Sequence, residues 1–206
     1  MEQSSRDELR EKLILATINR LAASGVSGVR ARDLASEVGC AVGTIYNLVG
    51  DLDDLILLAC ARTLEEFKVF ATDRFHHDEA NGATDLELLE SMAASYVDFA
   101  FLHRKRWQTA FEVSYEENSH FQEIYINGQR QLLDLIVKTL LKINADIDQN
   151  ELANIGRALW ASVHGIAMLA MGNPKNVLTR EKILEQCNRV IHPVAENVAN
   201  RAKNKA

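Results

Sequence analysis

The chain has 206 residues, of which 47% are hydrophobic, and its formal net charge is −6 at pH 7. This length and composition are sufficient for a buried core and exclude disorder as the global state. The negative charge excludes the simple inference from a basic chain to a nucleic-acid-binding protein. Any contact with DNA must therefore depend on a local patch of cations.

The sequence predicts an all-helical fold, because it has only two prolines and ten glycines and its apolar residues recur at spacings of three and four. We expect an N-terminal three-helix module, a long helix, and a C-terminal helical bundle. The polar segment 76–85 predicts a loop that ends in Thr84 or Asp85 as a helix N-cap, with Glu87 behind it. The nine expected helices cover about 5–23, 30–39, 41–48, 52–75, 85–103, 105–115, 119–143, 148–171 and 179–201.

The three cysteines, Cys40, Cys60 and Cys187, are far apart and form no C-x-x-C pair. We interpret them as small buried side chains in a reducing compartment rather than a disulfide or zinc framework.

The polar N-terminus does not resemble a secretory signal. The apolar segment 158–172 is shorter than the roughly 20 residues that span a bilayer, so we expect a cytoplasmic protein with no membrane partner, no metal and no cofactor.

The segment LASEVGCAVGTIYNLVGDLDDL, residues 34–55, predicts a helix, a sharp turn and a second helix. In a helix-turn-helix motif, the second helix presents its N-terminal residues to the major groove of DNA. Gly39 suits the turn, Ala35 permits a close helix contact, and Gly43 leaves an approach free of any side chain. The expected shared core consists of Leu34, Val38, Ile45 and Val49.

Residues 1–55 resemble the DNA-binding domain of the tetracycline-repressor (TetR) family of bacterial transcription regulators. The residues that match the family pattern are Arg32, Leu34, Ala35, Gly39, Gly43, Thr44, Ile45 and Tyr46. The resemblance implies a DNA-binding domain at 1–55 and a ligand-binding and dimerisation domain at 56–206.

The resemblance also implies that Thr44 and Tyr46 lie on the recognition helix, and that the Tyr46 hydroxyl contacts a phosphate. Arg32 would support the backbone contact, Arg30 could reach the same strand, and the Asn47 amide could bond an adenine edge. The expected DNA-binding residues are Arg30, Arg32, Val42, Gly43, Thr44, Tyr46 and Asn47.

Three positions depart from the family pattern. Ala41 stands where a serine would cap the recognition helix, Val49 replaces an aromatic residue, and Leu52 replaces a lysine that contacts phosphate in the family. Residues 1–55 also contain six cations and nine carboxylates, a balance of −3. We therefore expect weak DNA binding with a shallow salt dependence, because few phosphates are engaged.

Trp160, His164 and Gly165 form a W-x-x-x-H-G pattern, which resembles the motif of one class of C-terminal ligand-binding domain in this family. Aromatic and methionine side chains on three predicted helices could line a cavity for an apolar or amphipathic small molecule, although such stripes are more often plain core. The candidate ligand-binding residues are Met92, Tyr96, Phe99, His103, Trp107, Phe111, Trp160, His164 and Met168.

The sequence allows three interpretations of His164: a hydrogen-bonded core residue, a polar group in the pocket, or a pH-sensitive switch. The adjacent His76 and His77 are expected to be solvated.

Small residues on the penultimate helix and an apolar stripe on the last helix predict a four-helix homodimer interface. The small residues are Gly156, Ala158, Ala161, Ser162 and Gly165, and the stripe is Ile183, Cys187, Val190, Ile191, Val194 and Val198.

The favoured hypothesis is a homodimeric, ligand-responsive transcription regulator, most often a repressor in this family, that binds a palindromic DNA operator. A ligand-sensing dimer that has lost DNA binding is an alternative, motivated by Ala41, Leu52 and the local charge. An enzyme is less favoured, because the chain contains none of the common catalytic or nucleotide-binding motifs.

Overall fold

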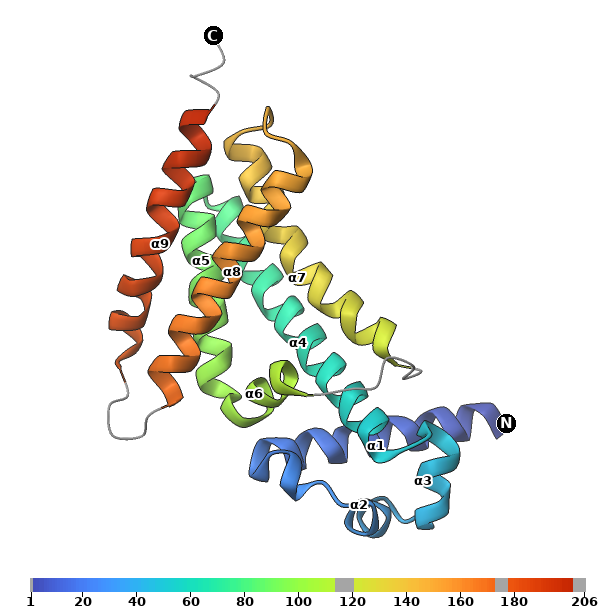
Figure 1. Ribbon diagram of the computed structural model, residues 1–206. Helices are drawn as coiled ribbons and strands as arrows, with labels where there is room; N and C mark the ends of the chain where they lie inside the picture. The colour runs from blue at the N-terminus through green and yellow to red at the C-terminus, as the bar shows by residue number, and fades with distance from the viewer. Residues whose placement is uncertain (1, 114–120, 173–177, 202–206) are drawn as a thin grey trace. The chain divides into compact units, whose positions relative to one another are not determined.

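The computed structural model describes residues 2–113, 121–172 and 178–201, and within these ranges the regular structure is entirely helical, as predicted (Figure 1). None of the helices in these ranges combines the length and the apolar composition that a membrane-spanning segment requires. The helices are α1 (Glu2–Ser24), the short 3₁₀ helix η1 (Val26–Gly28), α2 (Ala31–Val38), α3 (Val42–Val49), α4 (Leu52–Ala80), α5 (Asp85–Leu102), α6 (Arg104–Glu112), α7 (Gln122–Ile143), α8 (Gln149–Gly172) and α9 (Arg180–Asn200).

The chain forms two compact units. We call residues 1–66 with 103–128 the N-unit, and residues 67–102 with 129–206 the C-unit. The N-unit thus combines the three N-terminal helices with the first part of α4 and with α6. The domain boundary expected after residue 55 stays a prediction.

The core of the N-unit comes from apolar residues at helical spacing. Leu13 and Leu21 of α1, Leu34 of α2 and Ile45 of α3 are completely buried. The α6 helix packs against α1. It is also tied to α4, because a guanidinium nitrogen of the buried Arg106 lies 2.6 Å from the Glu66 carboxylate.

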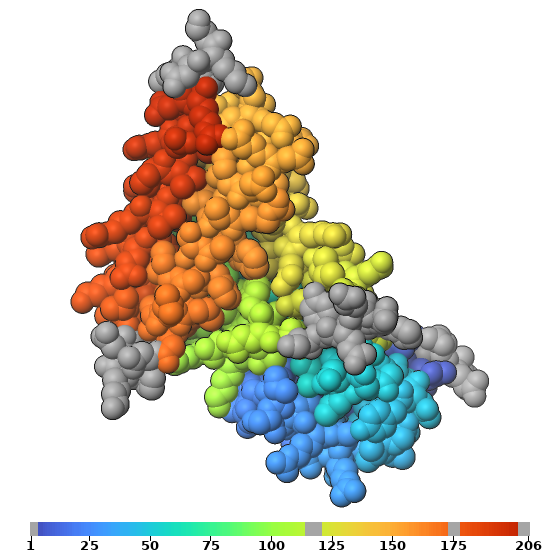
Figure 2. Space-filling model, in the orientation of Figure 1, coloured from blue at the N-terminus to red at the C-terminus, as the bar shows by residue number. Residues whose placement is uncertain are grey.

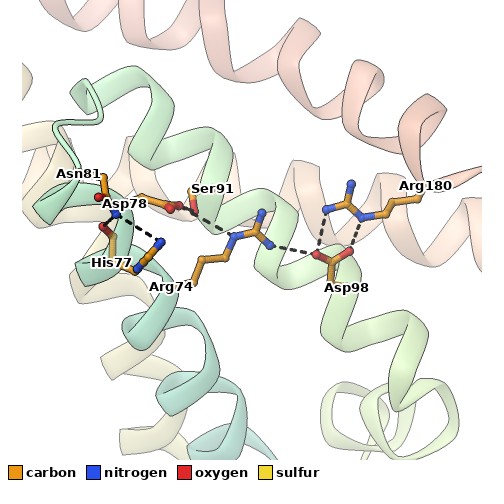
Figure 3. Close-up of polar contacts among 7 residues, drawn as sticks. All are labelled: Arg74, His77, Asp78, Asn81, Ser91, Asp98 and Arg180. Carbon is orange, nitrogen blue, oxygen red and sulfur yellow. Dashed lines mark hydrogen bonds and ion pairs between the residues drawn. The ribbon is translucent and has the colours of Figure 1, made fainter.

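In the C-unit, α9 packs against α5 and α8. Asp98 of α5 lies between two arginines, Arg74 of α4 and Arg180 of α9 (Figure 3). Each arginine donates a 2.9 Å hydrogen bond to Oδ2 of Asp98, and Arg180 donates a second bond to Oδ1. This cluster connects three helices through one carboxylate.

The prediction of a loop at 76–85 is wrong for its first half, because α4 continues to Ala80. The polar side chains there make contacts that hold the helix: Ser91 donates to Asp78 at 2.5 Å, and Lys142 pairs with Glu79. The helix ends at Ala80, and the side-chain amide of the following residue, Asn81, donates to the His77 carbonyl at 2.7 Å (Figure 3).

The predicted N-cap after this turn is confirmed at Thr84. The Thr84 backbone N–H donates to the Glu87 carboxylate at 2.7 Å, and the Glu87 N–H donates back to the Thr84 hydroxyl at 3.3 Å. This reciprocal pair satisfies two backbone donors at the start of α5. The predicted helix boundaries at 115 and 119 lie outside the described residues.

Two expectations about the last helices need correction. Gly156 is buried, and a Cβ atom there would lie 3.2–3.3 Å from Leu133 and Val137 of α7, so this glycine serves packing within the protomer. In the stripe of α9, Ile183, Cys187, Ile191 and Val198 are buried within the protomer, where α9 packs against α5 and α8. The sequence pattern could not tell an internal from an external apolar face.

Candidate functional site

The helix-turn-helix geometry is built by a three-residue connection between α2 and α3. Gly39 has φ +73° and ψ +39°, the left-handed conformation that favours glycine at a helix C-terminus. The backbone N–H of Cys40 then donates to the Ala35 carbonyl at 2.9 Å, and α3 begins at Val42. The predicted turn at Gly39 is thereby confirmed.

The inner face of this motif is apolar. Leu34 and Ala35 of α2 and Ile45, Leu48 and Val49 of α3 are buried. The predicted core residue Val38 is half-buried. Because these positions point inward, the remaining positions of α3 face outward.

The outer face of α3 presents Gly43, Tyr46 and Asn47, and Thr44 is half-buried beside them. Tyr46 is 45% exposed, and its hydroxyl makes no hydrogen bond among the described residues. A Cβ atom on Gly43 would meet nothing within 4 Å, so no internal contact requires a glycine there. In the space-filling view, α2 and α3 lie at the surface of their unit (Figure 2).

Several charged side chains of the N-unit form ion pairs between its helices. Arg20 of α1 contacts two carboxylates of α2, Asp33 at 3.5 Å and Glu37 at 2.8 Å. Arg62 of α4 lies 2.7 Å from the Glu11 carboxylate. Four of the nine carboxylates counted in residues 1–55, Asp7, Glu11, Asp33 and Glu37, are therefore paired within the unit. Because Arg62 lies outside residues 1–55, the balance of −3 omits a cation that neutralises one of these carboxylates.

Arg30 and Arg32 are exposed beside the motif, and neither guanidinium has an ion-pair partner among the described side chains. Val42, the remaining predicted residue, is half-buried at the start of α3. The structure thus brings the seven predicted DNA-binding residues to α3 and the start of α2. Charged groups that are exposed and unpaired are suited to bind phosphate oxygens.

The departure at Ala41 and the acidic start of α4 are both visible in the structure. Ala41 is the N-cap of α3 in an extended conformation and offers no side-chain acceptor. At the start of α4, Oδ1 of Asp51 accepts a 2.6 Å hydrogen bond from the Asp54 N–H, so this aspartate caps the helix. Asp53 and Asp54 lie in the first turn, where the helix dipole favours carboxylates.

The C-unit contains a mostly apolar pocket of about 70 Å³. It lies among α4, α5, α7 and α8, and Ile191 of α9 also contributes to its lining. A dry cavity of roughly 150 Å³ accommodates benzene, so this pocket must widen to enclose an aromatic ligand. Its lining residues are Phe67, Lys68, Ala71, Thr72, Leu89, Met92, Ala93, Tyr96, Gln131, Leu132, Leu135, Ile136, Leu159, Trp160, Val163 and Ile191.

Three of the nine predicted ligand-binding residues, Met92, Tyr96 and Trp160, line this pocket. Phe99 packs against Phe67, with ring centroids 5.3 Å apart, and Met168 is half-buried on α8 outside the lining.

His103, Trp107 and Phe111 belong to the N-unit, where the rings of Trp107 and Phe111 meet edge-on at 4.8 Å. Sequence reasoning missed Lys68 and Gln131, whose side chains join α4 to α7 through a 2.7 Å hydrogen bond at the pocket wall. The candidate ligand-binding residues are all aromatic, methionine or histidine residues, so a lysine and a glutamine were not included.

His164 is half-buried on α8, and its Nδ1 lies 2.5 Å from the Tyr96 hydroxyl oxygen. Its ring also contacts Trp160, with centroids 6.1 Å apart. This bond favours the interpretation of His164 as a hydrogen-bonded structural residue next to the pocket. No group of three potential metal-binding side chains occurs among the described residues.

The cysteines are unpaired thiols, two of them buried as predicted. Burial raises the pKa of Cys60 to about 12 and that of Cys187 to about 11. Both thiols are therefore protonated and inert near neutral pH.

Comparisons with known proteins identify the C-terminal part of the chain. Residues 89–186 match the family described as "Tetracyclin repressor-like, C-terminal domain". No curated protein matches the chain. The W-x-x-x-H-G subtype stays a prediction.

Solved structures share the fold. A TetR-family transcriptional regulator from Streptomyces coelicolor aligns with a TM-score of 0.65 at 15% identity, over 92% of this chain and 99% of that chain. RolR in complex with resorcinol aligns with a TM-score of 0.66 at 15% identity, over 97% and 96%. FadR from Bacillus subtilis in complex with stearoyl-CoA aligns with a TM-score of 0.65 at 14% identity, over 90% and 97%.

The family match and the solved structures both agree with the family resemblance that the sequence predicted. At such low identity the solved structures bear on the fold alone, whereas the family match identifies the C-terminal domain itself. Residues 89–186 therefore match a tetracyclin repressor-like C-terminal domain, and the chain shares the fold of a TetR-family transcriptional regulator.

Proposed function

We propose that this protein is a homodimeric, ligand-responsive repressor that binds a palindromic DNA operator in the cytoplasm. The observation that carries the proposal is the outer face of α3, where Gly43, Tyr46 and Asn47 are exposed beside the unpaired cations Arg30 and Arg32. Within the protomer, the exposed Tyr46 hydroxyl makes no described hydrogen bond, and no packing contact requires a glycine at position 43. Both suit close contact with a DNA backbone.

Each exposed group has a role in the proposed complex. The Tyr46 hydroxyl donates to a phosphate oxygen, and Thr44 does the same from the edge of α3. Arg30 and Arg32 bind the phosphates of the same strand from the start of α2, and the Asn47 amide reads a base edge in the major groove. Val42 and Gly43 at the start of α3 let the backbone approach the duplex.

Dimerisation through α8 is supported by an exposed apolar side chain next to small residues. Leu169 is 81% exposed, and a Cβ atom on Gly165 would meet nothing within 4 Å in the protomer. Ala158 and Ala161 are also exposed on this helix. A second copy packed there would bury Leu169, and the two-fold symmetry would match a palindromic site.

The pocket in the C-unit suits a small apolar or amphipathic molecule, because its apolar wall carries a few polar groups from Lys68, Tyr96 and Gln131. RolR and FadR, which share the fold, are described with resorcinol and stearoyl-CoA bound. A ligand that binds a widened pocket shifts the population toward that conformation by its differential affinity. If that conformation binds the operator less well, the ligand releases the DNA.

The test is selection of genomic DNA fragments by the purified full-length protein at low salt, followed by mass spectrometry of any co-purified small molecule. We expect enrichment of one palindromic fragment, and release of that fragment when the identified molecule is added. Absence of any enriched fragment at low salt would instead support the alternative, a sensing dimer that has lost DNA binding.

A further inference from the structure

The N-terminal turns of α1 hold a cation against the end of the recognition helix. Arg6 Nη2 donates to the Asn47 carbonyl at 3.4 Å, and Arg10 Nη2 donates to the Leu48 carbonyl at 3.3 Å. Both contacts place positive charge at the C-terminal end of α3, where the helix dipole is negative. No local sequence pattern connects the residues of each pair, which are 41 and 38 positions apart.

The two arginines differ in how their charge is balanced. Arg10 is half-buried and lies 3.7 Å from the Asp7 carboxylate. Arg6 is exposed, and among the described side chains no carboxylate lies within ion-pair distance of it. A carbonyl oxygen takes one of the five N–H donors of a guanidinium, so the remaining donors of Arg6 are available to a second acceptor.

Arg6 also lines a surface groove of about 510 Å³ between α1 and α3. The groove is formed by Ser5, Arg6 and Leu9 of α1 and by Thr44, Asn47 and Leu48 of α3. Thr44 and Asn47 belong to the proposed DNA-reading face. A duplex that contacts both of them therefore passes next to the guanidinium of Arg6.

We infer that Arg6 binds a phosphate of the DNA backbone at the flank of α3, and supplies a cationic contact that Leu52 cannot make at the start of α4. This inference rests on the proposed DNA-binding function. Arginine fits the position because its planar group can keep the Asn47 carbonyl while it donates two N–H groups to a phosphate. The Ser5 hydroxyl in the same groove offers a further donor to the same strand.

The experiment compares Arg6→Gln with Lys12→Gln in the full-length protein. Lys12 is an exposed cation on the same helix, and its six-residue spacing places it about 120° from Arg6 around α1. Binding to the selected duplex is measured by fluorescence anisotropy over a series of KCl concentrations. Thermal unfolding of each variant checks that the fold is intact.

For Arg6→Gln we expect affinity to fall about threefold to tenfold and the slope of log K against log salt to become shallower by about 0.9, the change for one lost phosphate contact. Lys12→Gln should leave the slope unchanged, and Arg6→Lys should restore most of it. The phosphate contact is overturned if Arg6→Gln keeps the wild-type slope, or if both glutamine variants change it equally. If the wild-type protein binds no duplex at all, the proposed function and this inference both fall.

Discussion

The hydroxyl oxygen of Tyr96 lies 2.5 Å from Nδ1 of His164 and joins the pocket wall on α5 to α8. We predict that Tyr96→Phe lowers the free energy of unfolding by about 1 kcal/mol, because the imidazole loses its partner while the ring packing stays. Urea denaturation measures this change.

The matched control for Tyr96→Phe is Tyr46→Phe. The Tyr46 hydroxyl is exposed and makes no hydrogen bond among the described residues, so its loss should change stability by less than about 0.5 kcal/mol and weaken only DNA binding. Equal stability losses in the two variants would contradict the structural role of the Tyr96–His164 bond.

Gly43→Ala separates stability from DNA binding. Open space surrounds the position of the added Cβ, and alanine favours helix over glycine by about 1 kcal/mol, so the variant should be at least as stable as the wild type. We expect its affinity for the selected duplex to fall at least several-fold, because the methyl group stands between α3 and the DNA. Gel-shift titration with parallel thermal unfolding tests both, and unchanged affinity would refute a close approach at Gly43.

Leu52→Lys should strengthen DNA binding by restoring the cation that the family pattern places at the start of α4. Each additional phosphate contact steepens the slope of log K against log salt by about 0.9. Leu52→Gln is the control, because it removes the same apolar side chain without adding charge. An unchanged slope in Leu52→Lys would mean that this position does not face a phosphate.

Leu169→Glu tests the proposed dimer surface on α8. Leu169 is 81% exposed in the protomer, so glutamate should disturb the protomer fold little. In a dimer interface the buried carboxylate would be costly, so we expect sedimentation velocity to show monomers. Leu102→Glu, at a leucine of α5 that is 72% exposed, should leave the oligomeric state unchanged. If the Leu169→Glu protein remains dimeric, the dimer interface does not include Leu169.

Asp98 makes stability depend on acidity. Partial burial acts to raise the pKa of Asp98, but the hydrogen bonds from Arg180 and Arg74 outweigh it and hold the pKa below its ordinary value. This carboxylate therefore stabilises the fold above the unfolded-state pKa of about 3.9, and its contribution is lost as the pH falls through the folded pKa.

Asp98→Asn should lower the free energy of unfolding by about 1–3 kcal/mol at pH 7, and the difference from the wild type should shrink below about pH 4. Urea denaturation at several pH values measures this. Asp134→Asn, at an exposed carboxylate of α7 with no described ion pair, should show neither effect. A pH-independent difference at Asp98 would show that packing rather than charge matters there.

The sequence predicts the features whose causes lie within a few residues. The left-handed turn at Gly39 and the reciprocal cap of Thr84 and Glu87 depend on residues at most a few positions apart. The absence of a side-chain cap at Ala41 follows from that residue alone. For the same reason the helical class and the approximate order of the helices could be predicted.

The tertiary structure decides which faces and charges meet, because those contacts join residues far apart in the chain. It pairs Arg20 with Asp33 and Glu37 and leaves Arg6 exposed at the end of α3, which a count of charges cannot distinguish. It also extends α4 to Ala80 by pairing Glu79 with Lys142, and places Gly156 against α7. Local propensity and periodicity determine the helices, whereas their packing determines which side chains remain available to DNA, ligand and partner.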